Sequence, residues 1–202
     1  MTNRMILIVA LAAAIIGAIA GLRFNGPGLL LGSEPGQRAL QQLAAAGAPP
    51  PPEGLEVAAR GDRIPALELP ALDGSAVRLP DGSGRPLLIN YWASWCSPCI
   101  EEMPELDRFA ASQGPDGVQV VGIALDDADA VRTFLQQVPV GYRILLDQPG
   151  PADTSVQLGN PAGVLPFTVL VDGNGVLQGQ RIGPFRDGEV DGWVGGQIQT
   201  RD

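Results

Sequence analysis

The stretch LINYWASWCSPCIEEMP, at residues 88–104, holds both cysteines of the chain, Cys96 and Cys99. It continues a mostly apolar run that starts at residue 86 and ends at residue 92, which is typical of a central strand buried on both faces. A helix is expected at about residues 97–112, and Pro98 suits its first turn because the missing N–H is not needed there. The stretch therefore predicts a strand that leads into a helix, with a C-x-x-C pair where the helix begins.

A C-x-x-C pair could be half of a zinc site, a structural staple, a coincidence or a redox centre. Zinc needs about four ligands, and the chain has no further cysteine and no histidine. A disulfide that closes so short a loop would stabilise the fold little through chain entropy. A pair beside a strand–helix pattern is a thioredoxin-like signal, so redox chemistry is the favoured interpretation. The thiolate is the nucleophile, and a helix N-terminus offers it free N–H groups and a positive dipole end.

Alternating strands and helices are predicted on both sides of this stretch. Strands are expected at residues 64–69 and 76–79, around a turn at Asp73 and Gly74, and then at 118–124, 143–146, 168–172 and 176–182. Helices are expected at 127–137 and from about 187, the last weakened by three glycines. This alternation indicates an α/β domain over residues 60–202 in which helices cover a sheet.

The N-terminal part differs from the rest. Residues 5–22 form an uncharged apolar run of 18 residues between Arg4 and Arg23. As a helix the run would span roughly 27 Å, about the thickness of a hydrocarbon core. Its length favours a single uncleaved membrane anchor over residues 1–23, and a cleaved signal peptide ending near Ala20 is the alternative. Both interpretations export the chain and place it in the periplasm or on the extracytoplasmic face of the inner membrane.

Residues 24–59 are rich in Pro, Gly and Ala and are interpreted as a linker. A short helix is expected at residues 37–46, followed by a stiff polyproline segment at 49–52.

Composition excludes several classes of function. The chain has 202 residues and a net charge of −9, so nucleic acid is excluded as a main partner because binding depends on neutralising phosphates. The lack of histidine and lysine excludes Ser-His-Asp and Cys-His mechanisms, imidazole metal sites and Schiff-base chemistry.

Three motifs, in the same order as in a known family, cover about residues 60–200. The block at 88–104 resembles the active-site block of thioredoxins, in particular the membrane-anchored TlpA/ResA/CcmG-like branch. The sequence VLPFTVLVDGNG at residues 164–175 is similar to that family's cis-proline loop and the hairpin after it, and residues 63–79 are similar to its N-terminal hairpin. The resemblance implies a thioredoxin-like fold with a central mixed sheet flanked by helices, a redox-active disulfide, and no cofactor or metal.

The resemblance also assigns roles to individual residues. Cys96 would attack and Cys99 would resolve the mixed disulfide, while Pro166 would be the cis-proline that faces the pair. Leu165 would offer its main chain to an extended substrate. The remaining substrate-facing positions implied are Trp95, Ser97 and Pro98, whereas Trp92 is expected to pack in the interior.

One position departs from thioredoxin itself. Asn90 stands where thioredoxins carry a buried aspartate that moves a proton for the resolving cysteine, and an amide cannot do that. Glu101 and Glu102 are the candidate replacements. Glu102 matches the Glu-x-Pro pattern of the membrane-anchored branch and is preferred, while Glu101 is expected on a solvated helix face.

The residues between the cysteines bear on the direction of electron flow. Oxidants of this fold commonly carry a histidine there, whereas Ser97 and Pro98 bring no cation, so a reductant is expected unless Arg108 or another arginine folds over the site. The implied substrates are disulfide-bearing exported proteins such as apocytochrome c, and the implied partner is a membrane electron donor of the DsbD/CcdA type. The alternatives are a disulfide oxidant, a thiol peroxidase, or a non-enzymatic copper carrier that uses the two thiolates as soft ligands.

Overall fold

The computed structural model describes residues 33–199 of the chain. The chain divides into two units at residues 40 and 41, and the α/β domain lies in the second unit. The apolar run at residues 5–22 lies outside the described residues, so the expected anchor stays a prediction. Within residues 33–199, no helix has both the length and the apolar character needed to cross a membrane.

Helix α3 (Glu34–Gly47) confirms the short helix expected at residues 37–46 and begins three residues earlier. The prolines at residues 49–52 are in irregular structure. From Ala58 onward the main chain is attached to the α/β domain. The Ala58 N–H donates to the Gln157 carbonyl at 2.8 Å, and the Gly61 N–H donates to the Leu177 carbonyl at 2.8 Å.

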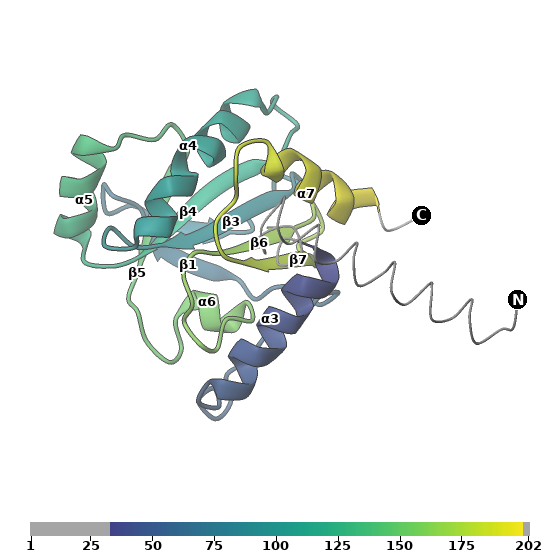
Figure 1. Ribbon diagram of the computed structural model, residues 1–202. Helices are drawn as coiled ribbons and strands as arrows, with labels where there is room; N and C mark the ends of the chain where they lie inside the picture. Colours follow the sequence, from purple (N-terminus) through teal and green to yellow (C-terminus); the bar gives the residue numbers. More distant parts are fainter. Residues whose placement is uncertain (1–32, 200–202) are drawn as a thin grey trace, which may run out of the picture. The chain divides into compact units, whose positions relative to one another are not determined.

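A five-stranded mixed sheet forms the centre of the domain (Figure 1), in the order β5-β4-β3-β6-β7. Its strands are β3 (Leu87–Trp92), β4 (Gln119–Leu125), β5 (Arg143–Asp147), β6 (Phe167–Val171) and β7 (Leu177–Ile182). Strands β3, β4 and β5 are parallel, whereas β6 runs antiparallel to both β3 and β7. The thioredoxin-like α/β fold with a mixed central sheet is thereby confirmed.

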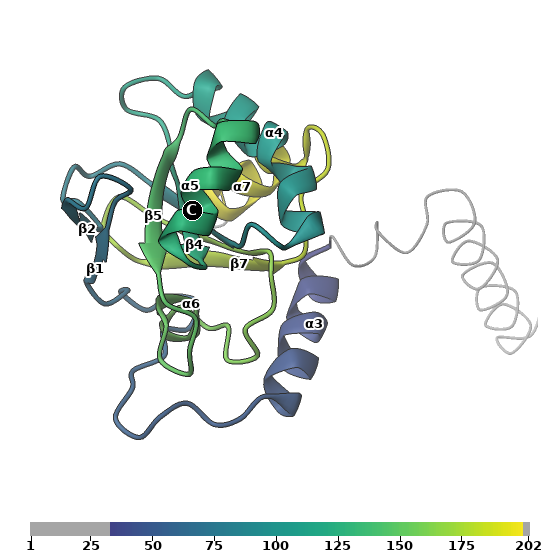
Figure 2. The same ribbon diagram turned by 90° about the vertical axis from the view of Figure 1, so that its left-hand side faces the viewer.

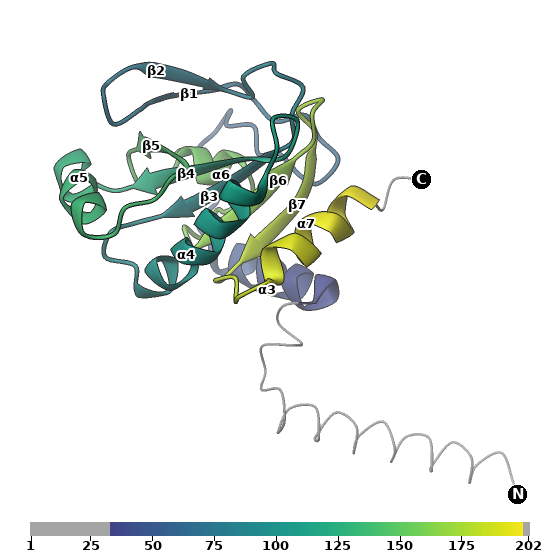
Figure 3. The ribbon, with the colours of Figure 1, turned by 90° about the horizontal axis from the view of Figure 1, so that it is seen from above.

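Two layers cover the sheet. Figure 2 shows α4 and α5 together on one face with α6 away from them, and Figure 3 shows the β1–β2 hairpin on the side opposite α4 and α7. The bounds of these elements are α4 (Ser97–Ser112), α5 (Ala128–Gln137), α6 (Thr154–Gln157), α7 (Glu189–Gln199), β1 (Leu67–Pro70) and β2 (Ala76–Leu79).

Strand β3 is buried along its whole length, as its apolar run predicts. Its side chains alternate between the two faces, because successive residues of a strand point to opposite sides. Leu88 and Trp92 join the core cluster that also contains both cysteines, while Ile89 and Tyr91 join the cluster on the other face. Asn90 lies between Leu88 and Trp92 in this alternation, so it points toward the cysteine side of the sheet.

Two details differ from the sequence prediction. The first strand begins at Leu67 and not at residue 64, because Pro65 has no N–H for a ladder. Arg63 instead forms an isolated bridge with Val176. Helix α6 is absent from the sequence prediction, since four residues are too few to show a helical period. Its start is marked by Asp153, whose side chain accepts from two main-chain N–H groups.

Candidate active site

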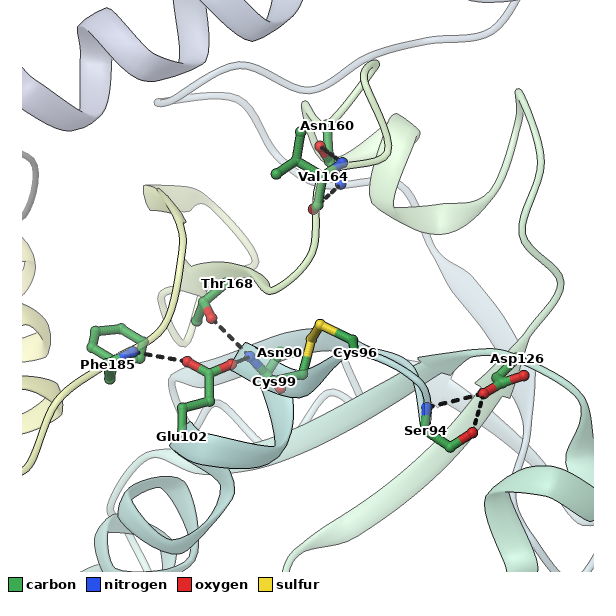
Figure 4. The surroundings of a disulfide bond; sticks show 10 residues. All are labelled: Asn90, Ser94, Cys96, Cys99, Glu102, Asp126, Asn160, Val164, Thr168 and Phe185. Atoms are coloured by element: carbon green, nitrogen blue, oxygen red, sulfur yellow. Dashed lines mark hydrogen bonds between the residues drawn. A yellow bond between two sulfur atoms is a disulfide. The ribbon is translucent and has the colours of Figure 1, made fainter. Parts of the chain in front are cut away.

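Cys96 and Cys99 are joined by a disulfide at the start of α4, with their Cα atoms 5.3 Å apart (Figure 4). Cys96 is the N-cap residue, and Pro98 occupies the first turn as expected. The N–H groups of Cys99 and Ile100 donate to the Cys96 carbonyl at 3.0 and 3.1 Å. The first turn therefore holds both sulfur atoms where the positive end of the helix dipole favours a thiolate.

The immediate surroundings of the disulfide are asymmetric. Trp95 is 72 % exposed, and Ser97 and Pro98 are also exposed, so these three form the outer rim. Cys96 is 4 % exposed and Cys99 is fully buried. Both cysteines are therefore buried, and Cys96, the cysteine expected to attack, is only slightly more exposed than Cys99. The two bonded cysteines belong to the same buried core cluster.

The segment before the disulfide is anchored by an acidic residue that sequence reasoning missed. Asp126 directly follows β4, and one of its carboxylate oxygens accepts from the Ser94 N–H at 2.9 Å and from the Ser94 hydroxyl at 2.6 Å. These two bonds fix the main chain next to Trp95. The pairing of β3 with β4 brings the two segments together, and nothing local in the sequence indicates it.

Glu102 is the buried carboxylate of the site. It lies three residues after Cys99 on α4, which puts both on one helix face, and none of its surface is exposed. Its Oε1 accepts from Asn90 Nδ2 at 2.7 Å, and its Oε2 accepts from the Phe185 N–H at 2.9 Å. Glu101 is exposed, as expected.

Asn90 orients this carboxylate. Its amide nitrogen donates both to Glu102 and to the Thr168 hydroxyl, the latter at 3.0 Å. The side chain is fully buried, and within the described part of the chain its Oδ1 has no hydrogen-bond partner. Strand β3 therefore supplies an amide that holds a carboxylate from α4, where thioredoxins place the acid on the strand itself.

Burial raises the pKa of Glu102 to about 7, because the charged form is poorly solvated there. The Phe185 N–H, the Asn90 amide and the positive charge of Arg181 act against this rise. Arg181 is buried on β7 and donates to a Glu189 carboxylate oxygen at 2.8 Å. A group that titrates near neutral pH is suited to accept and return a proton.

The arginine whose positive charge acts on Glu102 is Arg181, an arginine other than Arg108. Arg108 donates to both carboxylate oxygens of Glu105, at 2.7 and 2.9 Å, and also bonds Asp191. Its guanidinium group therefore joins α4 to α7.

The loop that precedes β6 carries the residues expected to face the disulfide. The Leu165–Pro166 peptide bond is cis, as the family resemblance implies, and Pro166 is buried. The Leu165 side chain packs against the core cluster that contains both cysteines. Trp92 is fully buried, in agreement with its expected packing role.

Sequence reasoning missed two residues of this network, Phe185, which bonds Glu102, and Thr168, which bonds Asn90. Phe185 contributes a main-chain N–H, which any residue can supply, so no side-chain pattern marks it. Thr168 could have been found, because it follows the LPF motif at the start of β6.

Within residues 33–199, no group of three His, Cys, Asp or Glu side chains is placed to hold a metal ion.

Comparisons with known proteins agree with this geometry. The family model described as Redoxin matches residues 59–193, a range that includes the C-x-x-C pair. Thioredoxin-like protein YneN of Bacillus subtilis (strain 168) is 30% identical over 136 residues, which cover 65% of this chain and 76% of that protein. Thiol-disulfide oxidoreductase ResA of Bacillus anthracis is 26% identical over 135 residues, which cover 66% of this chain and 76% of that protein.

A solved structure is also similar. The thioredoxin-related protein from Neisseria meningitidis serogroup B superposes with a TM-score of 0.59 at 32% sequence identity, covering 66% of this chain and 100% of that chain. The similarity in structure therefore extends over the whole length of that protein.

Proposed function

Because the chain belongs to the Redoxin family and is a thiol-disulfide oxidoreductase of the thioredoxin superfamily, we propose that it reduces disulfides in exported proteins on the extracytoplasmic side of a membrane. The observation that carries the proposal is the Cys96–Cys99 pair at a helix N-terminus, with the buried Glu102 carboxylate one turn further on. The apolar run at residues 5–22 supports the location, because either an anchor or a signal peptide would export the domain.

The reaction starts from the dithiol. The Cys96 thiolate attacks one sulfur of the substrate disulfide, which breaks that bond and releases one substrate thiolate. The Cys99 thiolate then attacks the Cys96 sulfur, restores the disulfide of the structure and releases the second substrate thiolate. The two protons of the dithiol end on the two substrate thiols, so the substrate gains two electrons and the protein loses two.

Glu102 is assigned the proton transfer at Cys99. The resolving thiol must lose its proton before it attacks, and Cys99 is fully buried. Glu102 shares its helix face and titrates near neutral pH, so it can take that proton when it is ionised. The cis Leu165–Pro166 segment and exposed Trp95 are assigned to substrate docking.

Reduction is the proposed direction because the chain has no histidine or lysine to stabilise the Cys96 thiolate further. A less stabilised dithiol has a lower reduction potential and gives its electrons up more readily. A reductant in an oxidising compartment must be recharged, so a membrane electron donor of the DsbD/CcdA type is the proposed partner. Apocytochrome c, whose cysteines must be reduced before haem attachment, is the proposed substrate class.

The test is insulin reduction by the soluble domain with dithiothreitol as electron source. Wild-type protein should accelerate precipitation of the insulin B chain, Cys96→Ser should be inactive, and Cys99→Ser should accumulate a mixed disulfide that a gel without reductant detects. Full turnover by Cys99→Ser would overturn the assigned roles. A fusion of alkaline phosphatase, which is active only after export, should be active at the C-terminus of the whole chain, and an inactive, stably expressed fusion would overturn the location.

A further inference from the structure

The loop between α6 and β6 is closed by one buried side chain, that of Asn160, which is 2 % exposed. Its Nδ2 donates to the Val164 carbonyl at 3.0 Å, and its Oδ1 accepts from the Val164 N–H at 3.0 Å (Figure 4). Its main chain also accepts from the Gly163 N–H and donates to the Ser155 carbonyl, each at 3.0 Å. The Asn160 amide thus pairs with Val164 as the peptide group of a neighbouring strand would.

Within residues 164–167, the segment that leads into β6, this pairing leaves one residue whose main-chain groups are unpaired. Val164 uses both of its groups on Asn160. Pro166 has no N–H, and its carbonyl accepts from the Gly183 N–H at 2.9 Å. Phe167 starts β6 and pairs with strands on both sides. Between them, the main chain of Leu165 forms no hydrogen bond within residues 33–199.

Leu165 lies where its unpaired main-chain groups can bind a substrate. Its side chain packs against the core cluster that contains both cysteines. In Figure 4 the main chain runs from Val164 down toward the disulfide and then on to Thr168. An extended peptide binds to free main-chain N–H and C=O groups by adding a strand. At this segment the peptide can pair with Leu165, because the main-chain groups of Val164 and the carbonyl of Pro166 already have hydrogen-bond partners.

We propose that Asn160 is a positioning residue that sets the register in which a protein substrate docks, by occupying Val164 and leaving only Leu165 to pair with the substrate main chain. The proposal rests on the proposed function, since it concerns the substrate of that same site. Without the Asn160 amide, the two Val164 groups compete for the incoming peptide and the loop loses its fixed course. The substrate then binds more weakly and can bind in a second register shifted by one residue, while the dithiol chemistry at α4 is unchanged.

Two variants separate docking from stability. Asn160→Asp has the same shape and keeps an acceptor for the Val164 N–H, but it turns an oxygen toward the Val164 carbonyl. Asn160→Ala removes both bonds to Val164 and also the bond that Asn160 Nδ2 donates to the Ser155 hydroxyl at 3.3 Å. The matched control is Asn174→Ala, at an exposed position in the β6–β7 turn.

The experiment measures insulin reduction as KM and kcat separately, together with the rate of reaction with the small disulfide of oxidised glutathione. Both Asn160 variants should raise KM for insulin roughly tenfold, the size expected for losing one or two hydrogen bonds, with kcat and the glutathione rate within twofold of wild type. The Asn160→Asp defect should shrink relative to wild type at acidic pH, where a protonated carboxyl group can donate to the Val164 carbonyl. The control should match wild type throughout.

The outcomes distinguish the two proposals. If wild type does not reduce insulin, the proposed function fails. Circular dichroism shows whether the Asn160 variants are folded. If wild type is active and folded Asn160 variants keep the wild-type KM for insulin, the inference is overturned. It is also overturned if kcat for insulin and the rate with glutathione both fall as much as KM rises, because Asn160 then has only a structural role. If Asn160→Ala does not fold, the pH dependence of KM in Asn160→Asp still decides.

Discussion

Replacing Glu102 by Gln should change how the stability of the oxidised protein depends on pH. Burial raises the pKa of Glu102 from 4.5 to about 7, so between these values the folded protein holds a proton that the unfolded chain has released. Stability therefore falls as the pH rises through this window and is level above it. At about 1.4 kcal/mol per pKa unit, the full loss from this one group is about 3 kcal/mol.

The Gln variant removes this loss because it carries no charge at any pH. Its amide can be accommodated, since Asn90 can turn its unpartnered Oδ1 toward it. Urea unfolding at pH 4.5 and at pH 8 measures the effect. The stability of Glu102→Gln relative to wild type should rise by about 3 kcal/mol between the two pH values, because the other titrating groups are the same in both proteins.

The matched control is Glu101→Gln, on the exposed face of the same helix. It should follow the wild-type pH profile. If the difference between Glu102→Gln and wild type is the same at both pH values, the carboxylate does not titrate as a buried group and the account of its role as proton acceptor fails.

Three further substitutions test the charge beside Glu102, the anchor of residue 94 and the packing of β4. Arg181→Met removes a positive charge that lowers the pKa of Glu102, so the pH midpoint of mixed-disulfide resolution, followed by stopped-flow fluorescence, should move upward; an unchanged or lower midpoint would contradict this. Asp126→Ala removes both bonds to Ser94 and should cost about 1–3 kcal/mol of stability in urea unfolding and raise KM for insulin, whereas a wild-type KM would show that this anchor does not serve docking. Gly122→Ala would place a Cβ 2.8 Å from a side-chain carbon on the neighbouring strand and should destabilise the fold by about 1–3 kcal/mol, and wild-type stability would refute this close packing.

The fold was largely predictable because its signals are local. Buried parallel strands appear as apolar runs, and the runs near residues 86–92 and 118–124 correspond to β3 and β4. The strand–helix junction at the cysteines was predictable for the same reason. Helix α6 has too few residues to show a period, and the first strand was placed too early because Ile64 is apolar, although its N–H pairs with Gly175 and not with β2.

The predictable parts of the active site were the residues of α4 and the cis Leu165–Pro166 bond, which the family resemblance implies. Glu102 could be found because residues 102–104 match the Glu-x-Pro pattern of the family that the chain resembles. Arg181 and Phe185 come to Glu102 from about 80 residues away along the chain, through the pairing of β6 with β7 and the turn after it. Asn160 is likewise defined by bonds to main-chain groups, which carry no side-chain pattern. Such contacts depend on the folded sheet, so sequence spacing does not reveal them.

The reduction potential of the Cys96–Cys99 pair tests the central claim most directly. Equilibration of the domain in glutathione buffers of graded composition, with the thiols trapped and counted by mass, gives the value. The helix N-terminus favours the Cys96 thiolate, but the chain has no histidine or lysine to stabilise it further. The account therefore predicts a potential nearer thioredoxin's, about −270 mV, than that of the strongest oxidants of this fold, about −120 mV. A value at the oxidant end would contradict the assignment as a reductant, and it would leave the fold unchanged.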